Sequence, residues 1–156
     1  MKKLAALLAI LLLVTALCAC GGSKEASLNF APADLSAKLL DSKCFTDLMS
    51  EMDNAVAFEI YGLDGSKVDS ASIYLGTGAT AEEIAVFKAK DADGAKVIKE
   101  AMDGRVQAQI KAYENYVPTE VPKLEEAIVA AKELYVVYVT SADAACAKGI
   151  IDEYMR

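Results

Sequence analysis

The stretch EIAVFKAKDADGA, residues 83–95, is matched in kind by ELYVVYVTSADAA, residues 133–145, fifty positions later in the chain. In each stretch, a run of β-branched and aromatic residues leads to an aspartate of the type that caps helices. An apolar period typical of an amphipathic helix continues beyond each aspartate. The two stretches therefore predict a strand followed by a helix, built twice. They are either a true repeat or two similar elements with the same capping chemistry.

Each of these strands has a second strand before it. Residues 70–77 are β-rich, and GATAE (residues 78–82) joins them to residues 83–90 as a hairpin signal. Residues 126–131 precede residues 135–140 in the same way. We therefore predict an α+β fold with two ββα units, whose strands form a mostly antiparallel four-stranded sheet.

The side-chain pattern of the first central strand bears on where the helices pack. Ala85, Phe87 and Ala89 alternate with Lys88 and Lys90 over the end of that strand. Such alternation is typical of a sheet with one buried and one solvated face. We therefore expect both helices on one face of the sheet.

The helical segments begin and end at recognisable residues. A single apolar stripe follows Asp91 and ends at Pro118, and Gly104 inside it predicts a kink or a break. One or two short helices are expected before the sheet. Residues 32–40 begin with proline and carry leucines at helical spacing, whereas residues 53–61 fit a short helix or a strand.

The N-terminal segment has the features of a lipoprotein leader. Two lysines precede an apolar run that is shorter than the roughly 20 residues of a membrane-spanning helix. The run closes on LCAC (residues 17–20), which resembles the lipobox of bacterial lipoproteins. Cys20 follows a small residue and fits that pattern, whereas Cys18 follows bulky Leu17 and does not. We expect removal of residues 1–19 and acylation of Cys20, for example with palmitate; the alternative is an ordinary cleaved signal peptide.

This leader would divide the chain into residues 1–19, a lipidated tether of residues 20–31, and a single domain of residues 32–156. Its removal leaves 137 of the 156 residues and takes two of the 16 basic side chains, so 14 remain against 23 acidic ones, a formal charge of −9. That balance argues against nucleic acid as a partner. The predicted location is the extracytoplasmic face of a bacterial cell membrane, reached through the lipid anchor.

Two cysteines remain in the predicted domain, Cys44 and Cys146. Outside the cytoplasm they can form a disulfide, which would close a loop of about 100 residues. They can equally be two small buried apolar residues, since free cysteines usually behave so. The sequence does not decide between the two states, and it is equally silent on the oligomeric state.

Four segments carry a resemblance to a known family: YGLD (61–64), GTGATAEEIAVFKAKD (76–91), NYVPTEVPKLEEA (115–127) and YVVYVTSAD (135–143). They resemble a family of short, uncharacterised lipoproteins of Gram-positive bacteria that is catalogued as a domain of unknown function. The resemblance implies an envelope lipoprotein with a small α+β domain. It brings no catalytic residues to transfer to this chain.

No motif in the sequence predicts a catalytic, cofactor or metal site. GTGAT (76–80) contains a GxG but leads from one strand to another, so we interpret it as a hairpin turn. Glu82-Glu83 and Glu125-Glu126 are paired carboxylates, but neighbours on a strand point to opposite faces, and we expect solvated edge charge. Asp91-Ala92-Asp93 is better explained by helix capping than by calcium. The absence of histidine excludes Ser-His and Cys-His mechanisms.

Three functions from different classes remain open. The favoured one is a non-enzymatic interaction module that contacts another envelope protein while its lipid holds it at the membrane. The second is an accessory lipoprotein that binds a small ligand in a pocket lined by tyrosines. The third is a wall hydrolase that uses carboxylates alone, which requires two acidic side chains about 5 to 9 Å apart across a groove.

Overall fold

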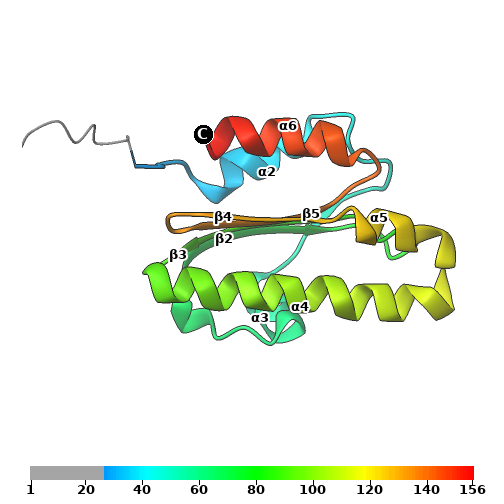
Figure 1. Ribbon diagram of the computed structural model, residues 1–156, viewed down its shortest axis with the longest axis horizontal. Coiled ribbons are helices and arrows are strands. Elements are labelled where there is room, and N and C mark those ends of the chain that lie inside the picture. Colours follow the sequence, from blue (N-terminus) through cyan, green and yellow to red (C-terminus); the bar gives the residue numbers. More distant parts are fainter. Residues whose placement is uncertain (1–26) are drawn as a thin grey trace, which may run out of the picture.

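A computed structural model of the chain describes residues 27–156, which form three layers with a sheet in the middle (Figure 1). The predicted leader, the acylation site at Cys20 and most of the tether lie outside the described residues. The sheet has five strands, all antiparallel, in the order β1-β2-β3-β5-β4. The strands are β1 (Ser50–Glu51), β2 (Val68–Leu75), β3 (Glu83–Ala89), β4 (Ile128–Lys132) and β5 (Tyr135–Thr140).

The four predicted strands are therefore confirmed, and the sheet gains a fifth. β1 has only two residues, which pair with the end of β2, and nothing in the sequence pattern marks so short an element. The α+β class is also confirmed. The helices are α2 (Pro32–Leu40), α3 (Asn54–Tyr61), α4 (Ala92–Tyr116), α5 (Val121–Glu125) and α6 (Ala144–Tyr154), with short 3-10 turns η2 (Gly65–Lys67) and η3 (Pro118–Glu120).

The expected caps determine the helix boundaries. The side chain of Asp91 accepts a hydrogen bond from the backbone N–H of Gly94, and Asp143 accepts one from Cys146 in the same way. Asp53 caps α3, so residues 53–61 are a helix rather than a strand, and Gly62 ends it with a φ of 62°. A left-handed residue after a helix is commonly glycine. α4 runs through Gly104 as one helix of 25 residues.

The prediction that both helices pack on one face of the sheet is wrong. α3 and α4 cover one face, and α2 and α6 cover the other (Figure 1). The first face buries Ala85 and Phe87 against α4, and the second buries Ile84 and Val86 against α2 and α6. The prediction was based on Lys88 and Lys90. Lys88 lies near the end of β3 and Lys90 beyond it, whereas the earlier positions on the same face, Ile84 and Val86, are apolar.

The two ββα units differ in where their helices pack. β2 and β3 lead to α4, and β4 and β5 lead to α6, as predicted from the repeated pattern. The two helices then pack on opposite faces of one sheet. The likeness between residues 83–95 and 133–145 is therefore one of local pattern and capping, rather than of two equivalent packed units.

Cys44 and Cys146 form a disulfide, with their Cα atoms 5.6 Å apart. The bond joins the segment after α2 to the first turn of α6, across 102 residues of sequence. Cys44 is fully buried in the core between the sheet and these helices. The covalent link therefore holds together the two helices of one layer, which are distant in sequence.

Candidate functional site

The free edge of the sheet lies along β4. Within residues 27–156, this strand pairs with β5 alone, whereas β3 and β5 each have a strand on both sides. The carbonyl of Leu134 accepts a hydrogen bond from Ala89 across the β3 side, so the backbone of the next residue, Tyr135, faces β4. Since backbone direction alternates along a strand, Ile128, Ala130 and Lys132 bond to β5, and the N–H and C=O of Val129 and Ala131 point outward.

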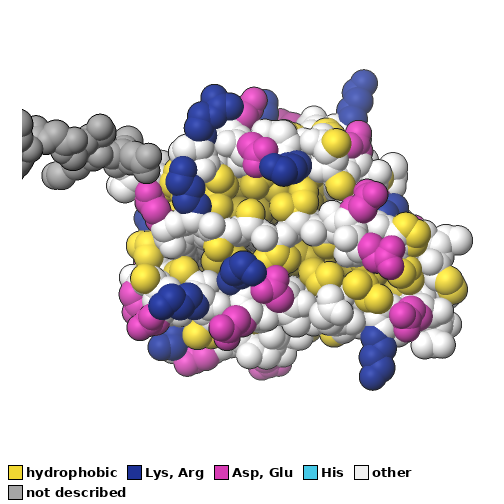
Figure 2. Space-filling view, in the orientation of Figure 1, with side chains coloured by type: hydrophobic (Ala, Val, Ile, Leu, Met, Phe, Trp, Pro, Cys, Tyr) yellow, Lys and Arg dark blue, Asp and Glu magenta, His cyan; other side chains and the backbone are white. Residues whose placement is uncertain are grey.

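Apolar side chains flank this edge on both faces of the sheet. On the α4 side, half-buried Val106 and Ile110 lie beside Ala127 and Val129. On the α6 side, Ile128 and Ala130 are half-buried. Together with Ile150 and Tyr154, they pack against the core between the sheet and helices α2 and α6. Figure 2 shows these two yellow bands, above and below a strip of white backbone at the sheet edge. A strand added to this edge would therefore find apolar side chains beside it on both faces of the sheet.

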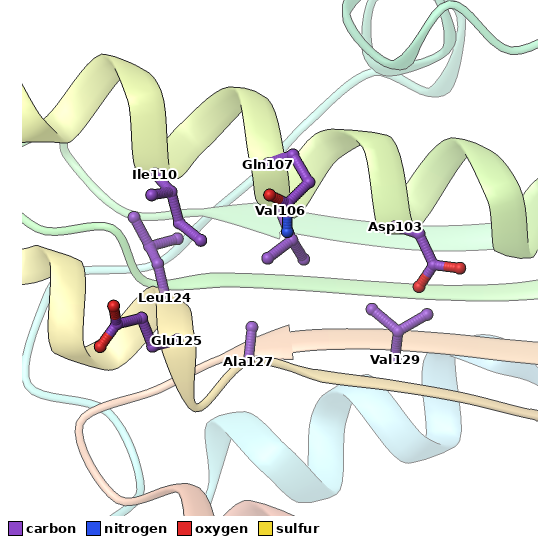
Figure 3. A pocket seen from close by; sticks show the side chains of 8 residues that line it. All are labelled: Asp103, Val106, Gln107, Ile110, Leu124, Glu125, Ala127 and Val129. Carbon is purple, nitrogen blue, oxygen red and sulfur yellow. The ribbon is translucent and has the colours of Figure 1, made fainter.

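The band on the α4 side is hollowed into an open groove of about 630 Å³ (Figure 3). Its floor is apolar and its rim is polar. Asp103 and Glu125 lie at its opposite ends, with Val106 and Ala127 between them. Asp103 is already paired with Lys99, at 2.7 Å between Oδ2 and Nζ. The groove is lined by Asp103, Val106, Gln107, Ile110, Leu124, Glu125, Ala127 and Val129.

Glu82 and Glu83 are not solvated edge charge, and that prediction is wrong. Glu83 is 1 % exposed and faces α4. Its Oε1 accepts a hydrogen bond of 2.6 Å from the hydroxyl of Tyr61, and Arg105 donates to its carboxylate from Nε and Nη2 at 3.2 and 2.9 Å. The carboxylate is thus occupied by three donors from α3 and α4, and its role is to tie both helices to β3.

Glu82 is 2 % exposed and makes a separate network. It accepts hydrogen bonds from the backbone N–H groups of Thr46 and Asp47, from the Thr46 hydroxyl, and from Lys123 at 3.3 Å. Burial on its own would raise the pKa of Glu82, but these donors outweigh burial and hold the pKa below its usual value. Glu82 and Glu83 have different partners, so the pair does not converge on one ion.

The tyrosines mainly serve the interior. Tyr61, Tyr113, Tyr135 and Tyr138 are buried, whereas Tyr116 is 71 % exposed. Burial, with the charge of Glu83 second, raises the pKa of both Tyr61 and Tyr138, so their hydroxyl groups stay protonated at neutral pH. Among the residues that the structure describes, no tyrosine lines the groove beside β4.

The remaining motifs have structural roles. GTGAT lies in the turn between β2 and β3, as predicted, and Glu125-Glu126 is exposed at the end of α5 rather than on a strand. Within residues 27–156, no group of three or more acidic, cysteine or histidine side chains could hold a metal ion. No helix over the same residues is long and apolar enough to cross a bilayer.

The free edge was not predicted from the sequence, although its signal was present. Residues 126–131 are predicted as the strand that precedes residues 135–140, and residues 70–77 as the strand that precedes residues 83–90, so either could lie at an edge of the sheet. What the sequence could not give is the order of the strands, which decides that β4 and not β2 remains uncovered.

Comparison with known proteins places the chain in a family. A domain of unknown function, DUF4358, matches residues 43–141. The chain belongs to the DUF4358 family. The matched segment of DUF4358 contains all five strands with α3, α4 and α5, and it leaves out α2 and α6. No curated protein and no solved structure matches the chain at a significant level.

Proposed function

We propose that this DUF4358 protein is a lipid-anchored interaction module on the extracytoplasmic face of the cell membrane, and that it binds an envelope protein along β4. The observation that carries the proposal is the edge itself: outward backbone groups at Val129 and Ala131, between two bands of half-buried apolar side chains. Proteins usually shorten, cover or charge such edges because they pair with other chains. An edge left open over a five-residue strand favours a binding role.

The acidic side chains favour this reading over an enzyme that works with carboxylates alone. Both buried glutamates are occupied by donors of the same chain, Glu83 by Tyr61 and Arg105, and Glu82 by Thr46 and Lys123. The two acids at the groove lie at its opposite ends (Figure 3). That placement does not suit a pair acting on one glycosidic bond.

Binding of a small ligand is the second candidate, and the volume of the groove favours it. About 630 Å³ lies within the range of small-molecule pockets, which is roughly 300 to 1,000 Å³. Such pockets usually enclose most of the ligand and hold a few buried polar groups. The groove here is open, and its polar side chains lie on the rim, so a protein strand fits it better than a small molecule.

The anchor can be tested first. Full-length protein expressed with labelled palmitate should incorporate the label, Cys20→Ala should abolish it, and Cys18→Ala should leave it in place. Label in Cys20→Ala would contradict the assignment of the acylated residue.

The docking surface is tested by cross-linking the full-length lipidated protein in native membranes and identifying what co-purifies by mass spectrometry. Ala131→Asp places a charge at the exposed edge, and Ala112→Asp places the same charge on an exposed position of α4 as a matched control. We expect one near-stoichiometric protein to be captured with the control and lost with Ala131→Asp. Capture of nothing, or equal capture with both variants, would contradict the proposed function.

A further inference from the structure

We infer that the occupant of this edge is a second copy of the same chain, paired antiparallel through β4 about a two-fold axis at Ala130. The inference rests on the proposed function, since it names the partner of the same surface. Two antiparallel β4 strands would join two five-stranded sheets into one continuous sheet of ten. Four independent features of the edge agree with this arrangement.

The first feature is the backbone register. Val129 and Ala131 direct their N–H and C=O outward, and Ala130 between them directs its own to β5. An axis through Ala130 places Val129 opposite Ala131 of the second copy, so two hydrogen-bonded pairs form symmetrically. Ala130 then lies opposite Ala130 of the second copy in a non-hydrogen-bonded pair. This is the closer of the two pair types, with Cα atoms about 4.5 Å apart.

The second feature is charge. Two of the carboxylates beside the edge are already paired within the chain, Asp103 with Lys99 and Asp152 with Lys148. Among the described residues, exposed Glu126 and Lys132, on either side of the apolar part of β4, make no ion pair.

Antiparallel pairing makes these two charges complementary. Reversal of the second strand sets Lys132 opposite Ile128 of the second copy, at the end of β4 that Glu126 of that copy precedes by two residues. The positive charge of each copy is thereby brought toward the negative charge at the start of the other copy's strand. The sequence EEAIVAAK is therefore complementary to itself when one copy is reversed.

The third feature is the pair of apolar bands. Side chains of an added strand alternate between the two faces of a sheet, and both faces are apolar at this edge. A second β4 brings Ile128 and Ala130 to the α6 side and Val129 to the α4 side. Each copy thus covers the exposed bands of the other with side chains of the same kind.

The fourth feature is the position of the tether. Phe30 stacks on Tyr135 with ring centroids 4.1 Å apart and meets Tyr154 of α6 edge-on, so the chain enters the domain on the α2–α6 side of the sheet. Leu28 also donates to Glu133 at the tip of the β4–β5 hairpin. A two-fold axis between antiparallel strands is perpendicular to the sheet, so both chains of the pair leave on that one side.

Two lipid anchors on one side of the dimer can enter the same membrane. The tether from residue 20 to residue 27 spans at most about 3.5 Å per residue, roughly 25 Å in all. The α2–α6 layer would then face the bilayer and the α3–α4 layer would face away from it. Confinement to a membrane raises the effective concentration of each copy for the other.

The test uses full-length protein in native membranes, with one cysteine added at the edge. Ala130→Cys should form a disulfide between two copies, because the paired Cα atoms lie within the range of about 4.4 to 6.8 Å that a disulfide needs. Ala131→Cys is the matched control, since its counterpart in the second copy is a diagonal neighbour beyond that range. We expect at least about tenfold more covalent dimer with Ala130→Cys on non-reducing gels.

Peptide mapping must find position 130 of one copy joined to position 130 of another, which separates the dimer from exchange with Cys44–Cys146. A charge swap provides a second measurement: Lys132→Glu should lower the yield from Ala130→Cys, and adding Glu126→Lys should restore it. Equal yields at positions 130 and 131, or no dimer at either, would overturn the inference. If position 130 instead cross-links to a different protein, the dimer is refuted and the proposed function stands; if it captures nothing, both fall.

Discussion

Removal of Arg105 should destabilise the protein far more than its partly exposed position suggests. The Arg105 side chain is 14 % exposed, but the Glu83 side chain that it bonds is only 2 % exposed. In Arg105→Met, the carboxylate of Glu83 would keep a single donor, the Tyr61 hydroxyl at 2.6 Å. Breaking a buried ion pair by removing one partner costs about 3 to 5 kcal/mol, because an uncompensated charge remains. That loss is a large part of the 5 to 15 kcal/mol typical of a domain.

Removing the pair as a whole should cost much less. Replacement of a buried ion pair by apolar side chains of similar volume is often close to neutral. Glu83→Met with Arg105→Met would still leave the Tyr61 hydroxyl without its acceptor, at about 1 kcal/mol. Adding Tyr61→Phe removes that last unpaired group, so the triple variant should recover most of the stability lost in Arg105→Met.

Urea unfolding followed by circular dichroism at pH 7 gives the free energies of unfolding that decide this prediction. Lys99→Met is the matched control on the same helix, because Lys99 forms an exposed pair with Asp103 at 2.7 Å. Exposed pairs of this kind contribute about 0.3 to 0.5 kcal/mol. The reasoning fails if Arg105→Met costs no more than Lys99→Met, or if the triple variant is less stable than the single one.

Three further predictions concern stability. Reduction of the Cys44–Cys146 disulfide, which closes a loop spanning 102 residues, should lower the free energy of unfolding by about 4 to 5 kcal/mol; an unchanged urea midpoint in reductant would contradict this. Gly104→Ala and Gly149→Ala should each stabilise a helix by about 0.5 to 1 kcal/mol, because an added Cβ meets no atom within 4 Å, whereas Gly62→Ala, at φ 62°, should destabilise in the same thermal melts. The pKa of Glu82 is depressed, so its contribution is present above the ordinary value of 4.5 and lost as the pH falls through the folded pKa; Glu82→Gln should therefore be less stable than the native protein at pH 7, with a gap that narrows below pH 4.5, and a gap independent of pH would refute the argument.

The elements that the sequence predicted well are those whose signals are local. Residues 32–40 coincide with α2, and the strand at residues 135–140 coincides with β5. Asp91 and Asp143 cap helices because the accepting carboxylate and the donating N–H lie three residues apart in the chain. Such contacts involve no distant segment, so the sequence contains all the information that they need.

The features that the sequence did not predict depend on contacts between distant segments. Glu82 is buried because Thr46 and Lys123, 36 and 41 residues away, supply donors for it. Glu83 is buried because Arg105, 22 residues away on α4, supplies donors for it. Burial of an unpaired charge is costly, so a carboxylate in a sequence is predicted to be exposed to solvent unless its hydrogen-bond donors are known.

The same distinction explains the error over the faces of the sheet. Lys88 suggested a solvated face, but one lysine at the end of a strand can reach solvent past the apolar residues beside it. Ile84 and Val86 on that face were the better indication, because two large apolar side chains need a covering layer. α2 and α6 supply that layer, and the Cys44–Cys146 bond joins it.

The two edges of this sheet are finished in different ways, and the difference locates the binding surface. At the β2 edge, β1 pairs with Tyr74 and Leu75, the N–H of Met52 bonds to the carbonyl of Ile73 at 2.9 Å, and Asn54 reaches the carbonyl of Ala71 at 3.4 Å. Short strands and side-chain bonds of this kind blunt an edge against further pairing. Along β4, none of the described residues supplies a comparable cover, and the flanking side chains are apolar on both faces. A strand that joins this sheet therefore has one place to bind, next to β4.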